Sequence, residues 1–159
     1  MAKKIRNRVP PTIDLIAYAQ EHLVYEAGMF VQARETLNHT APKTFPMNAM
    51  VEVCVLHLRN LVDFFYPTQN VKDDDVIAAD YVVDWGSACP VLSAVLEEAR
   101  KRAHKEMAHL TTSRISCCIP KKAWDFAALS VEMQPVVAAF TAGTKGKVPA
   151  ETVSVLLTI

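Results

Sequence analysis

Apolar residues recur at steps of three and four along four long stretches of the chain, which is the period of an amphipathic helix. Pro67 directly follows the second stretch and Gly143 follows the fourth, and both residue types commonly end helices. The four stretches are residues 13–37, 46–66, 90–113 and 121–142.

A fifth and shorter helix is predicted over residues 76–85, directly after the three aspartates 73–75. Negative charge at this position favours a helix start, because the N-terminal end of a helix dipole is positive. Pro90 is expected in the first turn of the third long helix. Long helices with short to medium connections predict an all-α fold, namely an antiparallel four-helix bundle with a short extra helix.

The two ends of the chain differ from this helical centre. Residues 1–11 are expected to form a basic arm, residues 12–142 the bundle domain and residues 143–159 a C-terminal tail. The tail ends in an apolar run rich in β-branched residues, which predicts an irregular or β-prone segment. Such a tail would pack on the bundle, pair with a copy of itself in a dimer, or stay disordered.

Composition narrows the functional class less than the pattern does. Lys and Arg number 17 and so do Asp and Glu, so the net charge signals neither nucleic acid nor membrane as a partner. No uncharged apolar run is long enough to span a bilayer, and the basic N-terminus lacks the apolar stretch of a secretory signal. We therefore expect a cytoplasmic protein without a membrane partner. The adjacent Cys117 and Cys118 suit neither a disulfide framework nor a zinc pair, so reduced thiols are expected.

Residues 100–110, near the end of the third helix, carry the densest polar chemistry. At about 100° per residue, Arg102 and His109 fall on one flank of a narrow apolar stripe, with Glu106 between that flank and the stripe. One interpretation is a functional cluster of these three side chains. The other is structural: Arg102 and Glu106 form an i,i+4 ion pair, and His109 bonds a main-chain carbonyl of a neighbouring helix.

The second helix is apolar nearly all round but carries one polar strip with Arg59 and Asp63 four residues apart. Charges on such a helix need partners or water, because burying an unpaired charge is costly. The two residues are therefore either a buried structural pair or part of a site wall. If the second and third helices are neighbours, Arg59 and Asp63 would approach the flank that carries Arg102 and His109.

The segment Arg102-Ala-His-Lys-Glu-Met-Ala-His109-Leu110 resembles the arginine–histidine motif of the HEPN superfamily, in particular its abortive-infection and toxin-like branches. The segment from His57 to Tyr66 is similar to the helix that those bundles place beside the motif. The resemblance covers residues 12–142 and implies a HEPN-like helical bundle. It also implies metal-independent RNA cleavage, without a cofactor, by a protein of the toxin or phage-defence type.

In that resemblance, His109 would act as general acid or base, and Arg102 would hold the scissile phosphate. Glu106, Arg59 and Asp63 would support these two residues. A homodimer would bring two such pairs together and supply both acid and base. The implied ligand is RNA or a nucleotide, and an antitoxin-type protein is the implied partner.

Two further hypotheses come from other functional classes. The first is a non-catalytic module that dimerises or binds a protein partner, which the apolar second helix and the tail favour. The second is a metal-binding bundle, because Glu106-Met-Ala-His109 has the Glu-x-x-His spacing of di-iron proteins. Only one copy of that spacing is present, so the sequence predicts no bound metal.

Overall fold

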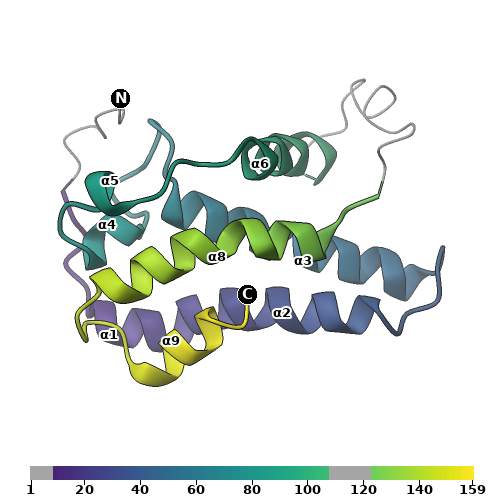
Figure 1. Ribbon diagram of the computed structural model, residues 1–159, viewed down its shortest axis with the longest axis horizontal. Coiled ribbons are helices and arrows are strands. Elements are labelled where there is room, and N and C mark those ends of the chain that lie inside the picture. The colour runs from purple at the N-terminus through teal and green to yellow at the C-terminus, as the bar shows by residue number, and fades with distance from the viewer. Residues whose placement is uncertain (1–8, 108–122) are drawn as a thin grey trace.

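The structure is a computed structural model and describes residues 9–107 and 123–159. Within those residues every regular element is helical, which confirms the predicted all-α class. Figure 1 shows α2 and α3 side by side, α8 lying over them, α6 along one edge and α9 along the other. The elements in chain order are α1 (Leu15–Tyr18), the π-helix η1 (Ala19–Leu23), α2 (Val24–Leu37), α3 (Phe45–Phe65), α4 (Ala78–Tyr81), α5 (Trp85–Ala88), α6 (Ala94–Met107), α8 (Phe126–Gly143) and α9 (Ala150–Leu156).

The first predicted helix is interrupted by a π-helical turn. Asp14 begins α1, since its Oδ1 accepts hydrogen bonds from the main-chain nitrogens of Ile16 at 2.9 Å and Ala17 at 3.1 Å. The five residues of η1 then separate α1 from α2 on one continuous course (Figure 1). A π-turn inserts one residue into a helix and so changes which side chains face the core before and after it.

The long helix α3 agrees closely with the helix predicted over residues 46–66. The Thr44 hydroxyl caps its start by accepting from the main-chain nitrogen of Met47. Its apolar positions are buried against α2, α6 and α8, so the helix is central to the fold, as its nearly continuous apolar surface predicts. The buried residues of α3 are Cys54, Val55, His57, Leu58, Leu61, Val62, Phe64 and Phe65.

An aromatic cluster joins the C-terminal end of α3 to α4, α5 and α8. Phe140 of α8 lies at its centre, with ring centroids 5.4 Å from Phe65 and 5.9 Å from Trp85. Phe64 and Tyr81 also contact Phe140 in edge-to-face geometry. Such pairs add about 0.5–1.5 kcal/mol each beyond the burial of their surface, so this end of the molecule is firmly packed.

The connection between α3 and α6 differs from the sequence prediction. The helix predicted over residues 76–85 is two one-turn helices, α4 and α5, separated by Asp84 in the left-handed conformation. Pro90 is not in the first turn of a helix, because α6 begins at Ala94. The Ser93 hydroxyl accepts from the main-chain nitrogen of Leu96 and supplies the cap instead.

The helix α8 continues through Pro135. Asp125 caps its start by accepting from the main-chain nitrogen of Ala128 at 2.9 Å. Among the described helices, α8 is the one whose length and mean hydropathy of 1.2 would suit a membrane span. Its buried residues pack in the aromatic core, and core helices commonly have this composition.

The prediction of an irregular or β-prone tail is wrong, because residues 150–156 form the helix α9. Pro149 and Glu151 suit its N-terminal end. Thr152, Leu156 and Ile159 are buried, and they recur at helical steps along a face that packs on η1 and α2. Burial of that face outweighs the strand propensity of the β-branched residues, which is weak and depends on context.

Candidate functional site

The end of α6 is tied to the start of α8 by Arg102. Its Nε donates to Glu106 Oε1 at 2.9 Å and its Nη2 donates to Glu106 Oε2 at 3.2 Å, which is a bidentate pair. The guanidinium also lies over the Trp124 ring, with Cζ 4.0 Å from the ring centroid. Trp124 in turn stacks on Phe126, with ring planes 4° apart and centroids at 5.9 Å. The i,i+4 pair predicted for Arg102 and Glu106 is therefore present, and the Trp124 ring covers one face of its guanidinium.

Arg59 and Asp63 form a second polar cluster with Arg100. Asp63 Oδ2 lies 3.6 Å from Arg59 Nε, and its Oδ1 lies 3.8 Å from Arg100 Nη1. Both distances exceed a hydrogen bond, and Arg59 Nε and Asp63 Oδ1 have no hydrogen-bond partner among the described residues. Burial raises the pKa of the Asp63 carboxyl, although the neighbouring Arg100, Arg59 and His104 lower it.

The two clusters lie on different flanks of α6, which corrects the facing expected from the sequence. Asp63 of α3 was expected near the flank of Arg102, yet its partner on α6 is Arg100. Arg100 also donates to the main-chain oxygen of Tyr66 at 2.9 Å and so fixes α6 against the end of α3. Arg102 faces α8 instead. His109, Cys117 and Cys118 lie outside the described residues.

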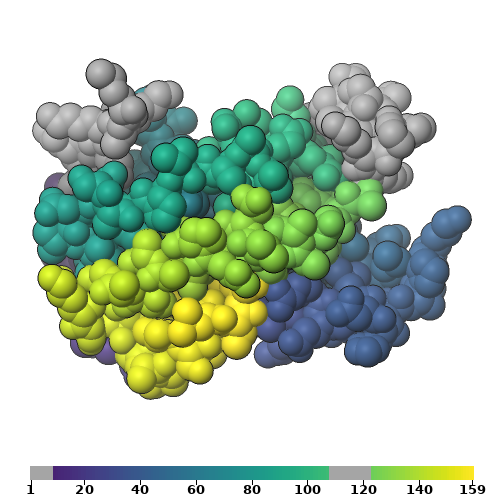
Figure 2. Space-filling model, in the orientation of Figure 1, coloured from purple at the N-terminus to yellow at the C-terminus, as the bar shows by residue number. Residues whose placement is uncertain are grey.

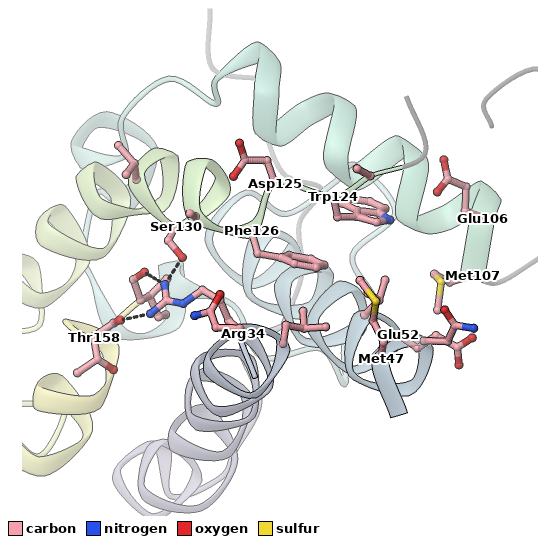
Figure 3. Close-up of a pocket in the computed structure, with 18 of the residues that line it drawn as sticks. Arg34, Met47, Glu52, Glu106, Met107, Trp124, Asp125, Phe126, Ser130 and Thr158 are labelled. Carbon is pink, nitrogen blue, oxygen red and sulfur yellow. Dashed lines mark hydrogen bonds between the residues drawn. The ribbon is translucent and has the colours of Figure 1, made fainter. Parts of the chain in front are cut away.

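A cleft of about 1210 Å³ opens beside the Arg102–Glu106 pair, between the adjoining ends of α2, α3, α6 and α8 and residues 157–159. We name it the Trp124 cleft. Figure 3 shows Trp124 and Phe126 on one side, with Met47, Glu52 and Met107 facing them across the opening. Figure 2 shows the C-terminal residues against α2 on the surface, with the turn between α2 and α3 projecting to one side of them. Its other lining residues are Arg34, Leu37, Asn38, Asn48, Val51, Glu106, Ala123, Asp125, Ala127, Ser130, Val131, Gln134, Leu157, Thr158 and Ile159.

Among the described residues that line this cleft, Arg34 is the cationic one, and its guanidinium is already engaged. Nη1 donates to Ser130 Oγ and, at 2.8 Å, to the main-chain oxygen of Ile159. Nη2 donates to the main-chain oxygen of Thr158 at 3.3 Å (Figure 3). Arg34 therefore joins α2, α8 and the residues after α9, and its role is to hold these elements together.

A smaller cavity of about 460 Å³ lies between residues 18–26, which run from α1 through η1 into α2, the second half of α3 and the loop before α4. Beside it, His57 Nδ1 is 2.7 Å from Glu26 Oε2, and Asn60 Nδ2 donates to the same oxygen at 3.0 Å. The Tyr25 ring meets His57 edge-on with centroids 5.5 Å apart. His57 is buried, so Glu26 satisfies a polar group that the apolar surface of α3 would otherwise isolate.

The sequence did not predict Glu26, Arg34 or Trp124 as members of a polar cluster, and Trp124 is the one that contacts a predicted site residue, Arg102. The available signal was the buried histidine on an apolar helix, which requires a partner from a neighbouring helix.

Neither the thiols nor the carboxylates of the described residues form a metal site. No group of three or more His, Cys, Asp or Glu side chains suited to a metal ion occurs among the described residues. The Glu-x-x-His spacing is only half described, since His109 lies outside those residues. Burial raises the pKa of the free Cys54 thiol to about 12 and that of Cys89 to about 11, which marks both as unreactive structural thiols.

Comparison with known proteins gives no relative from which a function could be transferred. No protein family, curated protein or solved structure matches the chain.

Proposed function

We propose that this chain is a HEPN-like helical module that binds a protein partner, either an antitoxin-type protein or a second copy of the chain, through the Trp124 cleft. In this proposal α2, α3, α6 and α8 are the four main helices of the bundle. The packing of α2 on α3, of α3 on α6 and of α6 on α8 supports that assignment.

The state of Arg102 carries the preference for binding over catalysis. Glu106 occupies the edge of the guanidinium formed by Nε and Nη2, and the Trp124 ring covers one face. An arginine that holds a scissile phosphate needs donors directed at the phosphate oxygens. Here a carboxylate already neutralises the charge, in a pair whose two side chains are 17% and 15% exposed.

A metal-independent ribonuclease is the second candidate, and the position of the cleft favours it. Glu106 and Met107 line the opening, and His109 follows Met107 by two residues in the sequence. RNA would supply the 2′-hydroxyl nucleophile that such cleavage requires. Catalysis would need Glu106 to release Arg102, which a partner or a second copy of the chain would have to bring about.

RNA cleavage in the presence of EDTA separates the two candidates. Purified wild-type protein, His109→Ala and Glu106→Gln would be incubated with a mixed RNA panel. The binding proposal expects intact RNA in all three reactions. Cleavage by the wild type that His109→Ala abolishes would establish the ribonuclease, and Glu106→Gln, which frees Arg102, would then increase the rate.

Partner binding is tested by site-specific photo-crosslinking in the source cells. A photo-reactive residue at Val131, on the wall of the cleft, should give a discrete adduct with a protein or with a second copy. The same residue at Val91, which is fully solvated and lies outside the cleft, is the matched control and should give none. The proposed setting is the reducing cytoplasm, which suits the free Cys54 and Cys89.

A further inference from the structure

The Trp124 cleft is larger than the sites that proteins build for small molecules. Its volume is about 1210 Å³, whereas small-molecule pockets are typically about 300–1,000 Å³. Its walls come from the ends of four long helices and from residues 157–159, so it is an open trough on the surface. These dimensions suit a segment of polypeptide.

The walls of the cleft are mixed, and their apolar part is exposed and adaptable. Val131 and Leu157 are each 61% exposed, which leaves two aliphatic side chains facing water at the opening. Met47 and Met107 line the opposite side, and their flexible thioethers adjust to the shape of an occupant. An apolar occupant would remove this surface from water.

Among the described residues that line the cleft, the charge that remains available is negative. Glu52 on α3 and Asp125 before α8 are exposed, and neither pairs with a cation among the described residues. The described lining residues include no lysine, and Arg34 is already engaged with Ser130 and two main-chain oxygens. Nucleic acid binding depends on Lys and Arg contacts to phosphate, so the described part of the lining disfavours RNA.

From these observations we infer that the Trp124 cleft receives a basic amphipathic helix of a partner protein. Apolar residues at positions i, i+3 or i+4, and i+7 of that helix would lie between Trp124 and Met47, which is the usual helix-in-groove arrangement. Lysines or arginines beside this apolar face would approach Glu52 and Asp125. The inference rests on the proposed function and specifies the chemistry of its partner.

The test uses two labelled peptides of roughly 14 residues, which is about four helical turns. Both carry leucine on one face; one has lysines on the remaining positions and the other has glutamates. Fluorescence anisotropy with the full chain at low salt should show the lysine peptide binding at least about tenfold more tightly. Equal binding of the two peptides would overturn the inference, because charge would then play no part.

Two variants locate the binding site. Glu52→Lys should weaken binding of the lysine peptide about five- to tenfold, and added salt should reduce the difference. Glu98→Lys makes the same charge change on the exposed face of α6, outside the cleft, and is the matched control. Equal losses in the two variants would mean non-specific attraction and would contradict the inference. Thermal melting confirms that both variants are folded.

The outcomes separate this inference from the proposed function. Suppose that the lysine peptide fails to bind, while light scattering shows a wild-type dimer that Val131→Ser dissociates. The occupant is then a second copy, so the inference fails and the proposed binding function stands. If the peptide fails and no adduct forms at Val131, both fail together.

Discussion

The guanidinium carbon of Arg102 lies 4.0 Å from the centre of the Trp124 ring, while its Nε and Nη2 both donate to Glu106. One side chain thereby joins two turns of α6 to the segment that begins α8. Arg102 precedes positions 108–122 and Trp124 follows them, so the contact joins two segments that are separate in the sequence. Its energetic weight can be measured directly.

Replacing Trp124 by leucine should reduce the free energy of unfolding by about 1–3 kcal/mol. The change removes the cation–π contact and the stacking on Phe126, and leucine fills less of the space. Urea unfolding followed by circular dichroism measures the loss. Val91→Ala, at a site 93% exposed, should change stability by less than about 0.5 kcal/mol. A Trp124→Leu protein as stable as the wild type would show that the contact is incidental.

Replacing Arg34 by methionine should destabilise the chain by about 1.5–3 kcal/mol, the usual range for hydrogen bonds that involve a charged group. The acceptors are Ser130 and the main-chain oxygens of Thr158 and Ile159, so the amides of α9 should exchange with deuterium markedly faster. Arg34→Lys should restore little, because one ammonium cannot reproduce the guanidinium fork. Wild-type exchange in the lysine variant would contradict this account.

Two glycines should respond in opposite directions to alanine. A Cβ at Gly143 would lie 2.6 Å from Val82 Cγ1, so the buried Val82 must move and Gly143→Ala should destabilise the fold by about 1–3 kcal/mol. At Gly28, in the middle of α2, the nearest atom is 3.9 Å away. Gly28→Ala should therefore stabilise by about 0.5–1 kcal/mol through helix propensity. Differential scanning calorimetry of both variants gives the two signs, and equal signs would reject the packing argument.

Replacing Asp63 by asparagine should affect stability in a pH-dependent way. Burial raises the pKa of Asp63 above its ordinary value of 3.8, so the folded state holds this proton more tightly than the unfolded state. The ionised carboxylate therefore costs stability at neutral pH, and that cost disappears as the pH falls below 3.8. Asp63→Asn should be more stable than the wild type at pH 7, and this difference in stability should vanish below pH 3.8.

Urea unfolding at a series of pH values tests this sign. Asp73→Asn, in the exposed loop before α4, controls for the loss of one negative charge. An Asp63→Asn protein less stable than the wild type at pH 7 would mean that attraction to Arg59 and Arg100 outweighs burial.

Helices were predicted well where the apolar repeat and the terminating residue both lie within or directly beside the helix itself. The helix α3 was predicted within one residue at each end, because its apolar residues recur over 21 residues and Pro67 follows soon after its end. The start of α6 was misplaced at Pro90, since proline and serine both suit a helix start and only packing decides between them. The tail was misread because the strand propensity of Val153 and Val155 is weaker than burial against α2.

The candidate site was predicted only where its contacts are local. The Arg102–Glu106 pair follows from helical spacing alone. The contact between Asp63 and Arg100 depends on the rotation of α6 about its own axis, which a narrow apolar stripe leaves loosely determined. Trp124 and Arg34 reach their partners across the fold, and one sequence contains no signal for such distances.

The π-turn η1 gives the first helix two independent registers on one axis. Before the π-turn, the Tyr81 hydroxyl donates to the main-chain oxygen of Leu15 at 3.0 Å. After the π-turn, Phe30 packs in the core beside Phe126. The inserted residue therefore works as an angular spacer. Deleting one residue within Ala19–Leu23 would leave a straight helix whose first turn points about 100° away from its present neighbours.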